Sequence, residues 1–138
     1  MIKFGLYTTF YNCEKFVDKI FTSVENINYD NFEWHITDDF STDNTEQLIK
    51  DRLNNSDLKH KIKYYRQTEK KQMYWKPNLF FNENFEWIIL LDADDDFDPN
   101  FLKIYNHFLE KNDDISLISS DFIKMIHNDN SLPSISYI

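Results

Sequence analysis

The chain has 138 residues, a length typical of one domain, and 41 % of them are hydrophobic. Its formal net charge of −9 argues against binding of nucleic acid, or of an anionic membrane, through a basic face. A single cysteine, Cys13, excludes an internal disulfide and a zinc site made of cysteines. No apolar run is long enough to span a bilayer, and the first residues show no cleavable signal pattern. These features predict a soluble, cytoplasmic protein.

Strand-like and helix-like segments alternate along the chain. Short, largely apolar runs predict strands at 2–8, 32–38, 61–66, 86–91 and 115–121. Helical spacing of apolar residues and helix-start signals predict helices at 13–27, at 43–53 and from Pro99 onward. Between the third and fourth strands, residues 67–85 favour an irregular piece and then a helix from about Asn78, and the tail to Ile138 has no clear pattern. The order predicts an α/β fold with a mostly parallel sheet and helices on both faces.

Two pairs of residues resemble helix starts. Asp43, with Glu46 three residues later, has the spacing of a capping box. Asp98 followed by Pro99 resembles an N-cap with proline at the first helical position. Helix capping therefore explains the carboxylate of Asp98 without a ligand.

Polar side chains follow three of the predicted strands at the point where each strand ends. They form the clusters 8–12, 38–41 and 92–98. Because ligands of open α/β sheets bind outside the carboxyl ends of the strands, these clusters predict one shared binding site.

The third cluster lies in "IILLDADDDFDP", residues 88–99, and places five carboxylates within seven positions. Asp92 and Asp94 come directly after a buried strand, where a negative charge is costly unless it is paired. A hard divalent cation prefers carboxylate oxygen and offsets the repulsion between such groups. The sequence therefore predicts a cation site at Asp92 and Asp94.

Four kinds of site that place acidic residues in this way can be compared with the cluster. A calcium loop of the EF-hand type needs glycine at position 6 and glutamate at position 12, and counting from Asp92 gives Phe97 and Lys103. A phosphatase of the haloacid dehalogenase type needs a second acidic pair, and the 44 residues after Asp94 hold no good one. A nucleotidyltransferase usually has a glycine-rich loop after the first strand, and "YTTFYN" has no glycine. A site that holds Mg²⁺ or Mn²⁺ against a diphosphate fits best, because the cation lets an acidic protein bind an anionic ligand.

Three stretches together resemble the family 2 glycosyltransferases with the GT-A fold. They are "TTFYNCEKFVDKIFTSV", "ITDDFSTDNTEQLI" and "LDADDDFDP". The resemblance implies a Rossmann-like nucleotide-diphospho-sugar transferase fold in a truncated or minimal form. It divides the chain into a nucleotide-sugar-binding domain at 1–121 and, at 122–138, a tail or the start of an acceptor-binding part.

The resemblance also implies roles for individual residues. Thr9 and Tyr11 line the nucleotide pocket, and one carboxylate of the pair Asp38 and Asp39 contacts the base. The aspartates of the third stretch divide between two tasks, with Asp92 facing the ribose or the metal and Asp94 ligating Mn²⁺ or Mg²⁺.

A lysine in the stretch "WKPNLF" is a candidate phosphate neighbour, namely Lys76. Arg66 and Lys70 fit an exposed surface position as well as a role at the site.

The sequence departs from the family pattern at two places. Phe40 stands where the family has glycine, a residue that supplies backbone freedom or close approach to a ligand. The general base of an inverting transferase lies well past the third stretch in this family, so no catalytic base is assigned.

The leading hypothesis is a metal-dependent, inverting transferase that uses a nucleotide sugar, by default a UDP sugar, and an unknown glycan, lipid or protein acceptor. The alternative is an incomplete or non-catalytic module that binds a nucleoside diphosphate. Apolar surface left exposed beside the missing half predicts a possible homo-oligomer.

Overall fold

The computed structural model describes residues 1–70, 85–112, 114–117, 123–126 and 134–137. The predicted helix from about Asn78 and the candidate residue Lys76 lie outside these ranges. None of the described helices is both long and apolar enough to cross a membrane.

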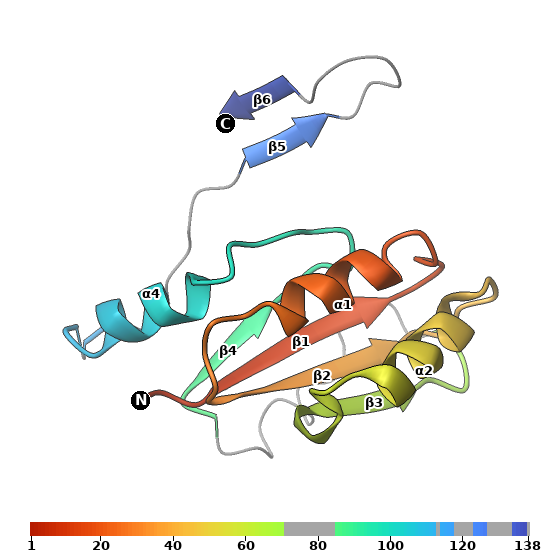
Figure 1. The fold of residues 1–138 in the computed structure, drawn as a ribbon, viewed down its shortest axis with the longest axis horizontal. Helices are drawn as coiled ribbons and strands as arrows, with labels where there is room; N and C mark the ends of the chain where they lie inside the picture. The colour runs from red at the N-terminus through yellow and green to blue at the C-terminus, as the bar shows by residue number, and fades with distance from the viewer. Residues whose placement is uncertain (71–84, 113, 118–122, 127–133, 138) are drawn as a thin grey trace.

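The centre of the molecule is a four-stranded parallel sheet (Figure 1). Its strands, in the spatial order β3-β2-β1-β4, are β1 (Phe4–Phe10), β2 (Phe32–Asp38), β3 (Ile62–Arg66) and β4 (Trp87–Leu90). The first four predicted strands are thus confirmed to within two residues at each end. The α/β class with a parallel sheet is confirmed as well.

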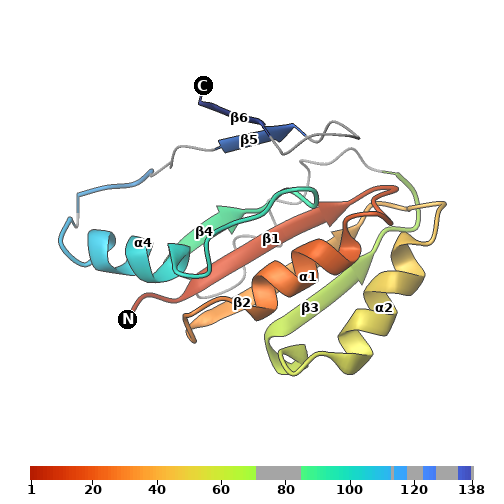
Figure 2. The same ribbon diagram turned by 45° about the horizontal axis from the view of Figure 1, so that its top comes forward.

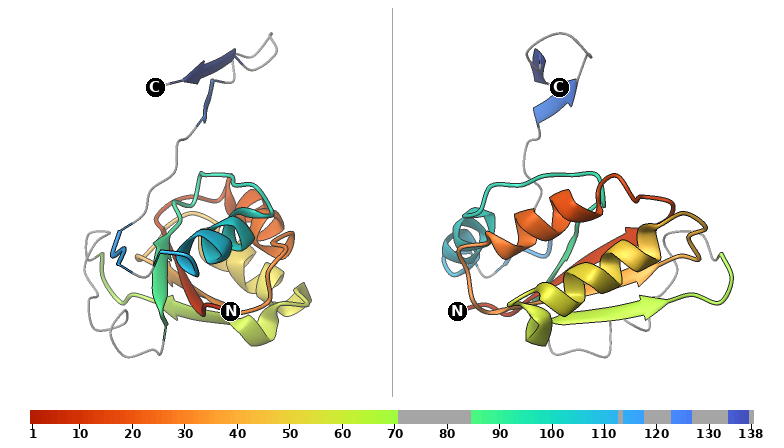
Figure 3. Two further views of the ribbon diagram at one scale, coloured as in Figure 1. Left: turned by 90° about the vertical axis from the view of Figure 1, so that its left-hand side faces the viewer. Right: turned by 45° about the vertical axis from the view of Figure 1, so that its right-hand side comes forward.

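The described helices lie on one face of this sheet (Figures 2 and 3). They are α1 (Val17–Glu25), α2 (Thr45–Asn55) and α4 (Phe101–Leu109), with a short 3₁₀ helix, η1 (Lys59–Lys61), before β3. Two successive right-handed crossovers, from β1 to β2 and from β2 to β3, step in one direction across the sheet and so place their helices on the same side. The connection that runs back from β3 to β4 contains residues 71–84, which lie outside the described part, so helices on the second face stay a prediction.

The core lies between the sheet and its helices. Alternate residues of β1 and β2 face the helices, and Trp34 packs edge-on against Phe21 of α1 with ring centroids 4.8 Å apart. The indole N–H of Trp34 donates to Thr8 Oγ1 at 2.9 Å, so the one polar atom of this buried ring is satisfied. The fully buried apolar side chains of this layer are Phe4, Leu6, Phe10, Val17, Ile20, Phe21, Val24, Trp34, Ile36, Ile49 and Leu102.

Both predicted helix starts differ in detail from the structure. Asn44 stands at the N-cap of α2 and the capping box is absent, because Asp43 Oδ1 accepts from the N–H of Thr45 at 3.0 Å while Glu46 binds Lys50 instead of turning back. Helix α4 begins at Phe101 and not at Pro99, with Asn100 at its N-cap. A backbone bond from Phe101 to the carbonyl of Asp98, 3.0 Å long, closes a turn before the helix starts.

The segment after α4 departs most from the prediction. Residues 115–117, the start of the predicted fifth strand, are not a strand, and the rest of 115–121 lies outside the described residues. The tail, which showed no pattern, instead contains β5 (Ile123–Ile126) and β6 (Ser134–Tyr137), paired antiparallel in a second sheet. Runs of only four residues are short for a pattern of alternation to identify, so sequence periodicity did not reveal these two strands. The domain boundary at 121 stays a prediction.

The only glycine of the chain, Gly5, allows an aromatic ring to approach the second face of the sheet. A Cβ atom at this position would lie 2.6 Å from Cδ2 of Phe85, well inside van der Waals contact. The Phe85 ring also packs edge-on against His35, with centroids 5.5 Å apart. Close approach of the ring to the backbone of β1 therefore requires glycine at position 5.

Gly5→Ala should lower the free energy of unfolding by about 1–3 kcal/mol, the usual cost of overpacking, because Phe85 must move. Urea unfolding measures the change. The same substitution in a Phe85→Leu background should cost much less, since the smaller side chain leaves room for the methyl group. An equal cost in both backgrounds would contradict this account of Gly5.

Candidate functional site

The carboxyl ends of three neighbouring strands lie side by side. Phe10 at the end of β1 pairs with Asp38 at the end of β2, and Asp38 pairs with Arg66 at the end of β3. The loops that follow these strands therefore leave the sheet at the same level. This confirms that the polar clusters at 8–12 and 38–41 meet at one edge.

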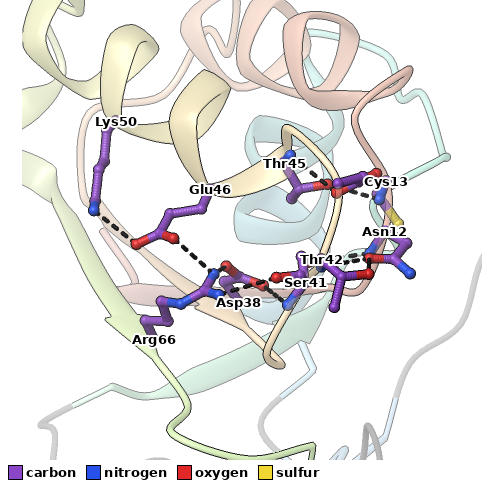
Figure 4. Close-up of polar contacts among 10 residues, drawn as sticks. Asn12, Cys13, Asp38, Ser41, Thr42, Thr45, Glu46, Lys50 and Arg66 are labelled. Atoms are coloured by element: carbon purple, nitrogen blue, oxygen red, sulfur yellow. Dashed lines mark hydrogen bonds and ion pairs between the residues drawn. The ribbon is translucent and has the colours of Figure 1, made fainter.

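A buried ion pair organises this edge (Figure 4). Asp38 is 0 % exposed, and its carboxylate forms an ion pair with the guanidinium of Arg66. The other Asp38 oxygen, Oδ1, accepts from the backbone N–H of Ser41 at 2.9 Å. Arg66 Nη2 donates to the carbonyl of Ser41, also at 2.9 Å. Asp38 and Arg66 together therefore bind both backbone polar groups of Ser41, in the loop after β2.

Arg66 also faces a second carboxylate. Its Nη1 lies 3.2 Å from Oε2 of Glu46 in α2, whose other oxygen accepts from Lys50 at 2.7 Å. Burial alone would lower the pKa of the Arg66 guanidinium, but the charges of Asp38 and Glu46 more than offset it and hold that pKa above its usual range. Arg66 therefore carries its positive charge at every physiological pH, engaged by protein carboxylates.

The first loop is fastened to the second by hydrogen bonds (Figure 4). The backbone N–H of Asn12 donates to Ser41 Oγ at 3.0 Å, and Asn12 Oδ1 accepts from the N–H of Thr42 at 2.8 Å. The N–H of Cys13 donates to Thr45 Oγ1 at 2.8 Å. Asn12 itself has a φ of 50°, a left-handed conformation that asparagine tolerates. The two loops thus form one connected structure.

Phe40 takes up the conformation for which the family pattern has glycine. Its φ is 66°, a value that is a genuine outlier for a bulky residue. Its ring lies over Arg66, 5.7 Å from the centre of the guanidinium. Phe40 thus has a φ that glycine adopts readily, and it places an aromatic side chain on this turn.

The structure brings four of the predicted nucleotide residues to this edge. Thr9 is half-buried near the end of β1, and Tyr11, 36 % exposed, follows that strand. Asp39 is 4 % exposed, and its backbone N–H donates to the carbonyl of Phe10 at 2.8 Å. Asp38, by contrast, is fully engaged by Arg66 and Ser41. Lys76 lies outside the described residues.

The acidic loop leaves the sheet next to β1. The N–H of Leu91 donates to the carbonyl of Tyr7 at 2.9 Å, so the loop starts about three residues short of the end of β1. Asp96 anchors it to α1, because Asp96 Oδ1 accepts from Ser23 Oγ at 2.6 Å and Oδ2 lies 3.9 Å from Lys19 Nζ. Asp96 thus ties the loop to α1, and Asp98 Oδ1 accepts from the backbone N–H of Asn100 at 2.7 Å before α4 begins.

The remaining carboxylates of the loop crowd one another. Asp92, Asp94 and Asp95 are exposed, whereas Leu91 and Ala93 between and before them are buried. Burial, and then the charges of Asp92 and Asp94, raise the pKa of the Asp95 carboxyl. Among the described residues no ion pair reaches Asp92 or Asp94. Two accessible carboxylates with no cationic partner in that part of the chain are a donor set that suits a hard divalent cation.

The protein does not supply a closed metal site in the part that is described. No group of three or more His, Cys, Asp or Glu side chains there is arranged to hold an ion. Mg²⁺ commonly binds through one or two carboxylates together with substrate phosphates, so Asp92 and Asp94 fit a cation whose other ligands come from a diphosphate and water.

Sequence reasoning left the roles of two residues at this edge undecided. Arg66 pairs with Asp38, and Lys70 Nζ lies 3.6 Å from the centre of the Tyr11 ring. The signal was Arg66's place at the end of a predicted strand, level with Asp38 in a parallel sheet. For Lys70 no such signal exists, because it lies in an irregular segment.

Comparison with known proteins identifies relatives of this arrangement. The family described as glycosyl transferase family 2 matches residues 6–136. No curated protein matches the sequence. Among solved structures, S. aureus TarS 1-349 in complex with UDP-GlcNAc has a TM-score of 0.70 and 22 % identity, and the match covers 96 % of this chain and 37 % of that one. The mannosyltransferase PcManGT from Pyrobaculum calidifontis, in complex with GDP-Man and Mn²⁺, has a TM-score of 0.67 and 16 % identity over 78 % of this chain and 32 % of its own.

These structural likenesses show a common fold. The chain spans about a third of the length of the structures that it matches. The family match extends over nearly the whole sequence, from the first strand to β6. The chain therefore belongs to glycosyl transferase family 2.

Proposed function

We propose that this chain forms the donor site of a glycosyltransferase that takes a sugar from a nucleoside diphosphate and transfers it, with inversion, to a glycan, lipid or protein acceptor. The donor is by default a UDP sugar, and the cofactor is Mn²⁺ or Mg²⁺. One observation carries the proposal: the loops after β1 and β2 are hydrogen-bonded together at the carboxyl edge of the sheet, beside the loop after β4, where no described cation pairs with Asp92 or Asp94.

Proteins of the same fold support the choice of ligand. TarS has been solved with UDP-GlcNAc and with UDP, and PcManGT with GDP-Man and Mn²⁺. Each ligand named there contains a nucleoside diphosphate, and one is accompanied by a divalent cation. A diphosphate is also the ligand for which an acidic protein most needs a bridging cation.

The roles of the nucleotide residues follow from their place at the carboxyl edge of the sheet. Tyr11 and Thr9 form one wall of the pocket, and Asp39, in the neighbouring loop, is the residue assigned to contact the base. Asp38 is a positioning residue, because Arg66 and Ser41 occupy both of its oxygens. Lys76 stays a candidate neighbour of the phosphates.

Asp94 and Asp92 would hold the cation. A bound Mn²⁺ or Mg²⁺ supplies Lewis-acid stabilisation of the negative charge that develops on the leaving nucleoside diphosphate. The chain's own contribution is to place the two carboxylates on a loop that Asp96 and Ser23 fix against α1. Attack by the acceptor hydroxyl at the anomeric carbon needs a general base, which is assigned to no residue of this chain.

Titration of UDP into the chain tests the donor site. UDP should bind in the presence of Mn²⁺, and binding should weaken at least about tenfold when EDTA removes the metal, because the diphosphate then faces uncompensated carboxylates. Asp94→Asn should produce a similar loss with the metal present. Isothermal titration calorimetry measures both.

Asp96→Asn is the matched control for this experiment. It removes the same charge from the same loop, and the side-chain oxygen of asparagine can still accept from Ser23 Oγ, so the anchor of the loop on α1 is kept. Affinity for UDP should change by no more than about threefold, as expected of a partly screened charge. Binding of UDP that is equally strong without metal, or unchanged in Asp94→Asn, would contradict the assignment of the cation to this loop.

Removal of Arg66 should destabilise the fold, because Asp38 then loses its partner. Arg66→Gln leaves Asp38 buried without its cation and should lower the free energy of unfolding by about 3 kcal/mol. Adding Asp38→Asn should recover part of the loss, because no buried charge then remains. Urea unfolding measures both, with Lys50→Gln as the control, since this exposed lysine also binds Glu46 and its loss should cost at most about 0.5 kcal/mol.

The alternative to a transferase is a module that binds the nucleotide without reacting it. Release of UDP from a UDP sugar, with and without candidate acceptors, distinguishes the two. Metal-dependent binding with no turnover under any condition would favour the binding module.

A further inference from the structure

Phe40 combines backbone strain with exposure. A phenylalanine at φ 66° is held in a conformation that its side chain disfavours, and glycine or asparagine would adopt it at little cost. Burial of the ring offsets this strain only in part, because 42 % of Phe40 remains exposed. Strained residues of this kind cluster at functional sites, where the surrounding structure holds them in place.

The surroundings of Phe40 fix the ring at the edge of the sheet. On one side of it in sequence is Asp39, on the other Ser41, which Asp38 and Arg66 both bind. The Arg66 guanidinium lies under the ring at 5.7 Å, a distance at which a cation is attracted to an aromatic face. The ion pair with Asp38 therefore positions the ring as well as the loop.

A second exposed aromatic side chain stands at the end of the adjacent strand. Tyr11 follows β1, and its ring also carries a cation, Lys70, at 3.6 Å. The neighbouring loops are tied together through Asn12 and Ser41. Two aromatic rings, each backed by a cation, thus belong to the same connected pair of loops that carries Asp39.

We infer that Phe40 is a specificity-determining residue that narrows the base pocket, so that the site accepts a pyrimidine nucleotide and disfavours the larger purine. The inference rests on the proposed donor site. A glycine at this turn would leave open the volume that the benzyl group occupies. A purine carries a fused second ring for which that volume is needed, whereas a uracil ring does not need it.

The expected preference for UDP over GDP can be set from the size of steric discrimination in other binding sites. One additional group in a tight apolar pocket changes binding by roughly 10- to 200-fold. The wild-type chain with Mn²⁺ should therefore bind UDP at least about tenfold more tightly than GDP, which differs from UDP only in its base.

The test measures the affinities of UDP and GDP in the presence of Mn²⁺ for the wild type, Phe40→Gly and Phe40→Leu. Phe40→Gly should reduce the UDP preference to about threefold or less, chiefly by tightening GDP, because the turn is kept and the ring is lost. Phe40→Leu keeps a bulky side chain at the same strained position and should retain most of the preference. Circular dichroism checks that the variants fold alike.

Each other outcome points to one failure. A wild-type preference for GDP, or the same ratio in wild type and Phe40→Gly with both nucleotides bound, would overturn the role of Phe40 and leave the donor site intact. Binding of neither nucleotide by the wild type would overturn the donor site itself. A loss of UDP affinity in Phe40→Gly without a gain for GDP would show a stacking platform in place of a size filter, and so would also overturn the inference.

Discussion

The ion pair between Asp38 and Arg66 is the interaction on which the candidate site depends. A carboxylate with no exposure at the end of a central strand is tolerable only with a cation and hydrogen bonds around it. Arg66, at the end of β3, supplies that cation, and its Nη2 donates to the carbonyl of Ser41. The need to pair the buried carboxylate of Asp38 therefore also fixes the position of Ser41, and with it the start of the loop after β2.

The same constraint passes to the rest of the edge. Because Ser41 is held, its hydroxyl and the neighbouring N–H of Thr42 can bind Asn12, and the loop after β1 is ordered in turn. The acidic loop after β4 is fixed separately, by Asp96 on α1. Under the proposed function, a donor would meet loops that are already held in place, so that little ordering of loops opposes binding.

The sequence predicted the parallel sheet well because buried strands and their crossover helices have strong local signals. The helical spacing of Val17, Ile20 and Val24 identified the face of α1 that is buried in the core, and the apolar run before Asp92 identified β4. The prediction failed at the starts of α2 and α4. An aspartate near a helix start can form either a turn or an N-cap with the same kind of hydrogen bond, and Asp43 and Asp98 form turns. Arg66 pairs with Asp38 and contacts Phe40 across strands that lie apart in the sequence, so the sequence alone left the role of Arg66 undecided.

Amide hydrogen exchange tests the central claim most directly, namely that Arg66 and Asp38 order both loops. If it is correct, Arg66→Gln should raise the exchange rates of the Ser41 and Asn12 amides by about tenfold or more relative to that of Ile36 in β2, because the two loops then open without unfolding of the sheet. Equal changes at all three amides would contradict it. They would mean that the ion pair stabilises the whole domain and has no particular part in building the site.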